Sequence, residues 1–193
     1  MINLILFGPP GAGKGTQSAK LIEKYSLTHI STGDLFRKHL KEGTPLGKLA
    51  QDYMSKGNLV PDQVVIDMVD EKISASGKIN GIIFDGFPRT IPQAQALDKL
   101  LEQKNAPIKI LVELVVPEDE LRTRLADRAI KEDRPDDAKP EVIEHRIGVY
   151  KAETAAVADY YKKANKYSSV IGVGKVDDIF QNICVQIDKS LLV

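Results

Sequence analysis

Hydrophobic residues gather in four short, nearly continuous runs, which are separated by longer segments of helical periodicity. Apolar runs without an alternating polar face are typical of strands that are covered on both sides. We therefore predict buried strands at residues 2–7, 81–85, 108–116 and 168–173. Apolar positions at helical spacing, with their start and stop residues, predict helices at residues 16–25, 32–43, 64–73, 92–104, 118–131, 140–164 and 176–191. Strands that alternate with helices predict an α/β fold, with one parallel sheet and helices on both faces.

The composition is that of an ordinary globular chain. Of the 193 residues, 42% are hydrophobic and 28% are charged, which fits one domain with a large core. The 27 basic and 27 acidic residues balance, so the overall charge does not indicate binding to nucleic acid or to an anionic membrane. We find no apolar run long enough to span a membrane and expect no signal peptide. The single cysteine, Cys184, excludes an internal disulfide and a four-cysteine zinc site, and we interpret it as a core thiol of a cytoplasmic protein.

Residues 8–16 read GPPGAGKGT and lie between the first predicted strand and the first predicted helix. Glycines let the backbone bend around an anion, and the N–H groups and the positive end of the following helix then point at one place. The stretch follows the GxxxxGK[ST] phosphate-binding pattern, with Gly15 inserted between Lys14 and Thr16. The lysine can reach the outer phosphates of a nucleotide. The loop therefore predicts binding of a nucleoside triphosphate, but it leaves an ATPase, a GTPase switch and a kinase open.

Two further motifs separate these classes. A GTPase needs a base-reading NKxD stretch and a DxxG switch, and we find neither. The chain instead carries ISTGDLFR at residues 30–37 and DGFPRTIPQA at residues 85–94. Together with GPPGAGKGT, these motifs stand in the order and spacing of the adenylate kinases, a family of nucleoside monophosphate kinases, which the chain resembles over essentially its whole length. The resemblance implies the P-loop NTPase fold, with a parallel central sheet, and reversible Mg²⁺-dependent transfer of the terminal phosphoryl group from ATP to AMP, which gives two ADP.

Arginines supply the charge that such a reaction needs. Phosphoryl transfer between two nucleotides brings many negative charges together, so it requires positioned cations and the exclusion of water. A guanidinium fork matches a phosphate better than an ammonium does. Six arginines stand in or near the motifs: Arg37, Arg89, Arg124, Arg128, Arg134 and Arg146. Arg89 follows a predicted strand end, where open α/β sheets bind ligands, and Arg124 and Arg128 share one face of a helix.

The resemblance carries roles over to the matching residues. The catalytic residues that it implies are Lys14, Asp85, Arg89, Arg124, Arg128, Arg134 and Arg146. The implied ATP-binding residues are Gly11, Ala12, Gly13, Lys14, Gly15, Thr16, Arg124, Arg128 and Gly174. The implied AMP-binding residues are Thr32, Arg37, Asn58, Leu59, Val60, Gly86, Phe87, Pro88, Arg89, Gln93, Arg134 and Arg146. Gln93 would pair with the adenine edge through its amide, and Asp85 would orient Mg²⁺ through water, the alternative for Asp85 being a turn or cap residue.

The resemblance also divides the single domain into three parts. These are a core of residues 1–30, 61–126 and 138–193, a small helical arm for the nucleoside monophosphate at 31–60, and a lid at 127–137. Long forms of the family insert a β-rich lid, often with four zinc-binding cysteines. Here Arg128 and Arg134 lie close together in the sequence and the chain has one cysteine. We therefore expect the short-lid form, without structural zinc.

Substrate choice and partners follow from the same resemblance. Thr32 and the run from Thr90 to Gln93 favour AMP as acceptor, and a UMP/CMP kinase is the alternative. A nucleotide-binding regulator that had lost the transfer reaction would have a broken arginine set, whereas this set is intact. We expect Mg²⁺ to be held by the nucleotide phosphates and water, without a dedicated metal site in the protein. The expected partners are ATP, AMP and ADP, without nucleic acid or membrane, for a monomer in the cytoplasm.

Overall fold

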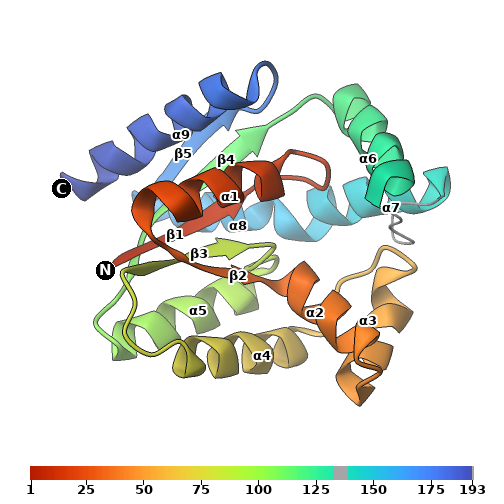
Figure 1. Ribbon diagram of the computed structural model, residues 1–193, viewed down its shortest axis with the longest axis horizontal. Coiled ribbons are helices and arrows are strands. Elements are labelled where there is room, and N and C mark those ends of the chain that lie inside the picture. The colour runs from red at the N-terminus through yellow and green to blue at the C-terminus, as the bar shows by residue number, and fades with distance from the viewer. Residues whose placement is uncertain (133–138, 193) are drawn as a thin grey trace.

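The computed structural model describes residues 1–132 and 139–192. Within these residues, five strands form one sheet in the order β2-β3-β1-β4-β5, and every neighbouring pair is parallel (Figure 1). The strands are β1 (Ile2–Phe7), β2 (Thr28–Ser31), β3 (Gly81–Asp85), β4 (Ile108–Val115) and β5 (Tyr167–Ile171). The predicted α/β fold with a parallel central sheet is confirmed.

Helices cover both faces of this sheet (Figure 1). One face carries α1 (Lys14–Tyr25) and α9 (Val176–Leu191), and the other carries α4 (Asp62–Ala75), α5 (Ile91–Gln103) and α8 (Ala156–Lys163). Side chains of β1 alternate between the two resulting cores. Leu4 and Leu6 belong to the core beneath α1 and α9, whereas Ile5 and Phe7 belong to the core beneath α4, α5 and α8. Because both faces are buried, odd and even positions from Leu4 to Phe7 are apolar, which explains the nearly continuous hydrophobic run.

Two short helices within residues 31–60, the range of the predicted arm, stand beside the sheet (Figure 1). They are α2 (Thr32–Lys41) and α3 (Pro45–Met54). The Ser31 hydroxyl accepts the N–H of the third residue of α2, and the Thr44 hydroxyl accepts the N–H of the third residue of α3. Such caps satisfy backbone donors that have no partner inside a helix. Local sequence therefore suffices to begin both helices.

The two arm helices cross closely at Gly47. A Cβ atom built there would lie 2.3 Å from the backbone C of His39 and from the backbone N of Leu40. Backbone atoms cannot move aside as the end of a side chain can, so Gly47→Ala is expected to destabilise the arm by roughly 1–3 kcal/mol. The resemblance to the adenylate kinases then predicts a higher KM for the nucleoside monophosphate, a small change in KM for ATP, and a lower Tm in thermal unfolding.

Gly148, in α7 (Pro140–Val149), provides the matched control, because a Cβ there meets nothing within 4 Å. Gly148→Ala should leave both KM values unchanged and raise stability slightly, by up to about 1 kcal/mol, through helix propensity. If the two variants behaved alike, the close crossing at Gly47 would not be what fixes the arm.

Two local features differ from the sequence-based expectations. Strand β2 was not predicted, because its sequence THIS is short, has three polar residues out of four and has no apolar run. The helix expected at 140–164 is not continuous: α7 passes into a π-helical turn, η2 (Tyr150–Thr154), before α8 begins. The turn brings Tyr150 against the sheet, where its hydroxyl donates to Glu113 Oε1 at 2.9 Å. A widened turn of this kind depends on a tertiary contact, which periodicity does not report.

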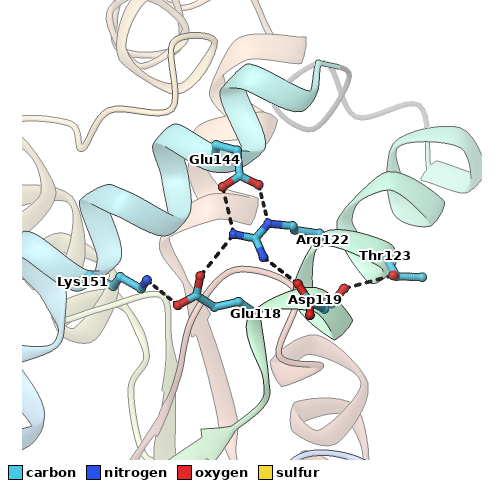
Figure 2. A network of polar contacts seen from close by, with 6 residues as sticks. All are labelled: Glu118, Asp119, Arg122, Thr123, Glu144 and Lys151. Atoms are coloured by element: carbon cyan, nitrogen blue, oxygen red, sulfur yellow. Dashed lines mark hydrogen bonds and ion pairs between the residues drawn. The ribbon is translucent and has the colours of Figure 1, made fainter.

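An ion-pair network joins α6 (Glu118–Glu132) to α7 (Figure 2). Arg122 of α6 donates from Nε and Nη2 to the two carboxylate oxygens of Glu144 on α7, at 2.5 and 3.1 Å. Its remaining bonds reach Glu118 and Asp119, and Lys151 completes the network by pairing with Glu118. Arg122 is partly exposed, so each pair adds little alone, but the bidentate geometry fixes the helices that precede and follow residues 133–138.

Two remaining expectations concern Cys184 and the membrane. Cys184 lies in α9 and is 2% exposed, which confirms a buried core thiol. Across residues 1–132 and 139–192, no helix combines the length and the apolar character that a membrane span requires.

Candidate active site

The loop between β1 and α1 owes its shape to three glycines. Gly8, Gly11 and Gly13 have φ angles of 138°, 82° and 93°, which residues with a side chain rarely adopt. A Cβ atom on Gly8 would lie 2.8 Å from the carbonyl oxygen of Leu114, and one on Gly11 would lie 3.1 Å from that of Leu121. The loop is therefore pressed between β4 and α6. These contacts give the physical reason for the glycines of the predicted phosphate-binding pattern.

Lys14 begins α1, and its ammonium turns back into the loop. Its Nζ donates to the carbonyl oxygens of Gly8 and Pro9 at 2.8 and 2.9 Å. Burial is the largest cause that lowers the pKa of Lys14 to about 8, from an ordinary value of 10.5. The charges that also act on it are Asp85, which raises the pKa, and Arg89, Arg128 and Arg146, which lower it. The structure thus gathers cations around an ammonium that holds its proton weakly.

This pKa predicts proton uptake when a polyphosphate binds. An anionic ligand favours the charged ammonium and returns the pKa toward 10.5, so ATP binding at pH 8.5 should take up about 0.7 proton per site. Affinity for ATP should fall about tenfold from pH 8 to pH 9.5. Calorimetric titrations in buffers of different ionisation enthalpy measure the uptake.

The lowered pKa of Lys14 also makes the free energy of unfolding depend on pH. Between pH 8 and 10.5 the unfolded chain binds more protons at Lys14 than the folded chain does. The free energy of unfolding of the ligand-free protein therefore gains a contribution that rises with pH across this window. Lys14→Met should abolish both the proton uptake and this contribution; an unchanged proton uptake in the variant would assign the shift to another group.

A cavity of about 710 Å³ opens at the carboxyl ends of the central strands. Residues of the predicted ATP set that line it are Gly11, Gly13, Lys14, Gly15, Thr16, Arg124 and Arg128. Asp85, Phe87 and Pro88 line it as well. Open parallel sheets bind ligands at this edge, because the loops that follow the strands diverge there.

A smaller cavity of about 60 Å³ adjoins the first on the side of α2 and α3. Residues of the predicted AMP set that line it are Thr32, Arg37, Asn58, Leu59, Val60, Gly86, Arg89, Gln93 and Arg146. Three guanidinium-bearing residues, Arg37, Arg89 and Arg146, line both cavities. The junction between the two cavities is therefore cationic, which suits a group of high negative charge.

Gly86 organises this junction. Its carbonyl oxygen accepts hydrogen bonds from the Thr32 hydroxyl and from Arg89 Nε, both at 2.8 Å. Its φ of 72° lies in the left-handed region, and a Cβ atom there would lie 2.9 Å from Arg89 Nη2. One backbone carbonyl thus holds the first residue of α2 and an arginine of the loop after β3 in fixed relation.

Arg37 is held in the ligand-free protein by its neighbour in α2. Its Nη2 donates to Asp34 Oδ1 at 2.5 Å. Partial burial raises the pKa of Asp34, but the hydrogen bond and charge of Arg37 outweigh this effect, so the pKa lies below its ordinary value. A phosphate would have to draw Arg37 from this partly exposed pair, which costs little in water.

The cationic face of α6 lies beside the glycine loop. Arg124 donates from Nε to Glu120 at 2.7 Å, and its Nη1 would lie 3.8 Å from a Cβ on Gly13. Arg128 lines the larger cavity one turn further along α6, as the spacing of the two residues predicts.

Two predicted site residues, Ala12 and Gly174, line neither cavity. Ala12 is buried beneath the loop, and Gly174 is exposed in the turn between β5 and α9. Residues 133–137 of the predicted lid, Arg134 among them, lie outside the described residues. The roles of all three stay predictions.

Several cavity residues were missed by the sequence reasoning. Asp127, Lys131, Tyr150 and Thr154 line the larger cavity. Lys131 follows Arg124 and Arg128 at helical spacing, so the repeat of cations along one face could have indicated it. No comparable signal exists for Tyr150, because the π turn that places it at the cavity has no sequence signature.

Oxygen donors for a magnesium ion are present at the wall of the larger cavity. Among the described residues, no group of three histidine, cysteine or acidic side chains is arranged to hold a metal ion. The Asp85 carboxylate, only 13% exposed, and Thr16 both line the larger cavity. This donor set fits Mg²⁺ that takes its other ligands from phosphates and water.

Comparisons with known proteins agree with this geometry. The protein-family model described as adenylate kinase matches residues 6–166. The chain is 45% identical to the adenylate kinase of Bacteroides thetaiotaomicron, with 98% of this chain and 100% of that protein covered. It is 46% identical to the adenylate kinase of a Cyanothece species, with 98% and 96% covered, and 45% identical to that of Parabacteroides distasonis, with 95% and 96% covered. Together with the parallel sheet and the glycine loop at its edge, these matches show that the chain belongs to the adenylate kinase family.

Proposed function

We propose that this ATP:AMP phosphotransferase binds Mg-ATP in the larger cavity and AMP in the smaller one. The terminal phosphoryl group of ATP would then pass to AMP, giving two ADP. The observation that carries the proposal is the junction of the two cavities, which Arg37, Arg89 and Arg146 line from both sides. A phosphoryl group in transit occupies such a junction.

The residues act by position and charge. Lys14 and the N–H groups of the glycine loop would hold the outer phosphates of ATP, and Arg128 would approach them from α6. Arg124 would stack on the ATP adenine. Arg37 and Arg89 would hold the phosphate of AMP. Arg89, Arg128, Arg146 and, in the predicted lid, Arg134 would stabilise the charge on the transferring group.

Magnesium would neutralise charge between the outer phosphates of ATP. The Asp85 carboxylate would orient water on the ion from the wall of the larger cavity, with Thr16 on the same side. The proposed metal site is therefore mostly nucleotide and water.

Exclusion of water would separate transfer from hydrolysis. We propose that residues 31–60 and 127–137 act as the arm and the lid that close over the nucleotides, and that residues 1–30, 61–126 and 138–193 form the core. Lid closure is a common gating step in enzymes, and the adenylate kinase lid is itself a standard example of it. The arm helices α2 and α3, which stand beside the sheet, support the division.

We also propose that the chain acts as a cytoplasmic monomer on nucleotides alone. Balanced charge and one buried cysteine support this. Light scattering of the purified protein tests the monomer, and cell fractionation tests the compartment.

The acceptor is tested by ADP formation from Mg-ATP with AMP, GMP, CMP and UMP in turn. We expect fast turnover with AMP and weak turnover with the others. Turnover that was equal or better with UMP or CMP would overturn the choice of AMP and favour the UMP/CMP alternative. Binding of ATP without transfer to any acceptor would indicate a regulator.

A further inference from the structure

Gln93 lies at the wall of the smaller cavity with its amide already engaged. The residue is 1% exposed. Its Nε2 donates to Asp62 Oδ1 at 2.8 Å, and its Oε1 accepts the backbone N–H of Arg89 at 2.8 Å. The Thr90 hydroxyl donates to the same Asp62 oxygen at 3.0 Å. Asp62 is the first residue of α4, so it joins the start of α4 to the start of α5.

Asp62 and the Arg89 backbone N–H allow the Gln93 amide only one orientation. A carboxylate only accepts hydrogen bonds, and a backbone N–H only donates them. Turning the amide over would place its oxygen against Asp62 and its NH₂ group against the Arg89 N–H, which costs both bonds. The orientation shown leaves one N–H of Nε2 and one lone pair of Oε1 for a ligand, in a fixed order.

We propose that Asp62 is a positioning residue that locks the Gln93 amide and thereby selects the base of the acceptor. The proposal rests on the smaller cavity being the AMP site. The Watson–Crick edge of adenine offers an amino donor beside a ring-nitrogen acceptor, and cytosine offers the same order. Guanine and uracil offer a carbonyl acceptor beside an N–H donor, which is the reverse order. A free glutamine amide can turn over to match either edge, whereas a locked amide matches only one.

The hydrogen bond between Gln93 and Asp62, called the lock below, is therefore expected to affect the four acceptor bases differently. Losing it should relax discrimination against GMP and UMP, because their edges need the reversed amide. It should not relax discrimination against CMP, whose edge already has the order of adenine. Rejection of CMP would come from base size instead, so CMP is a control within each experiment. A site that hydrogen-bonds its substrate rejects mismatched edges through the groups left unpaired.

The test compares kcat/KM for AMP, GMP, CMP and UMP in four variants. Asp62→Ala removes the acceptor, and Asp62→Leu removes it with a side chain closer in size, in case the alanine variant is unstable. Asp62→Asn can still accept from Gln93 and Thr90 through its Oδ1. Asp67→Ala removes an exposed carboxylate from the same helix; its partner is the surface residue Gln63, at 2.7 Å.

We expect Asp62→Ala and Asp62→Leu to lower the preference for AMP over GMP and over UMP by about tenfold, with the preference over CMP changing less than threefold. The KM for ATP should stay within twofold. Asp62→Asn should keep the wild-type preferences within about threefold, and Asp67→Ala should match the wild type.

Gln93→Ala separates failure of this proposal from failure of the AMP site. If Gln93→Ala raises the KM for AMP but neither Asp62→Ala nor Asp62→Leu changes any preference, the lock is overturned and the AMP site stands. A uniform loss for all four acceptors in the Asp62 variants would also overturn the lock. If Gln93→Ala leaves every acceptor unaffected, the smaller cavity is not the AMP site, and both proposals fail.

Discussion

Replacement of Lys14 by methionine is expected to slow ADP formation by about three orders of magnitude while the fold is retained. Methionine keeps the length and the apolar stem but removes the ammonium that would follow the outer phosphates through transfer. The ammonium also bonds the carbonyl oxygens of Gly8 and Pro9, so the variant should show more mobility in this loop. The measurement is steady-state ADP formation with Mg-ATP and AMP, accompanied by a thermal melt.

Lys20 provides the matched control for Lys14. It lies on the same helix, but its ammonium pairs with Asp177 at 2.9 Å, away from both cavities. Lys20→Met should change kcat and both KM values by less than twofold. A Lys14→Met enzyme with near-normal kcat would contradict the role assigned to the glycine loop.

Replacement of Arg89 by lysine is expected to lower kcat by roughly 10²–10³-fold, even though the charge is kept. The Arg89 guanidinium donates from Nε to the Gly86 carbonyl and lines both cavities. Lysine cannot keep that bond and also present two parallel donors to a phosphoryl group. The loss should appear in kcat as well as in the KM for AMP, because the proposed contact is strongest when charge develops on the transferring group.

Arg122→Lys is the comparison for this variant. Arg122 belongs to the network between α6 and α7 shown in Figure 2, and it lines neither cavity. Its conversion to lysine should leave kcat within twofold and change the Tm little, because exposed ion pairs contribute little to stability. An Arg89→Lys enzyme that lost only affinity for AMP, with kcat unchanged, would show that Arg89 binds the acceptor without stabilising the transfer.

Those parts of the fold that depend on burial and on local chemistry could be predicted from the sequence. Continuous apolar runs predicted strands β1, β3, β4 and β5, and helix α9 begins and ends where its pattern indicates. Strand β2 was missed because the four residues Thr28–Ser31, of which only Ile30 is apolar, become a strand only by pairing with β3. The π turn at Tyr150–Thr154 was missed for a related reason, since its contact with Glu113 joins residues far apart in the chain.

The candidate site divides in the same way. Lys14, Arg37 and Arg89 stand in local motifs, and the structure places all three on cavity walls. The hydrogen bond of Asp62 to Gln93 could not be predicted, because it joins two helix starts through tertiary packing. Periodicity reports which face of an element is buried, but not which polar groups meet there.

The central claim is transfer between two nucleotides bound in adjoining cavities. The most direct test follows the phosphorus nuclei by NMR during the reaction of Mg-ATP with AMP. The account predicts two ADP formed for each ATP consumed, without release of inorganic phosphate, and no consumption of ATP when AMP is omitted. Release of inorganic phosphate in step with ADP, at a rate that does not depend on AMP, would show hydrolysis in place of transfer and contradict the account.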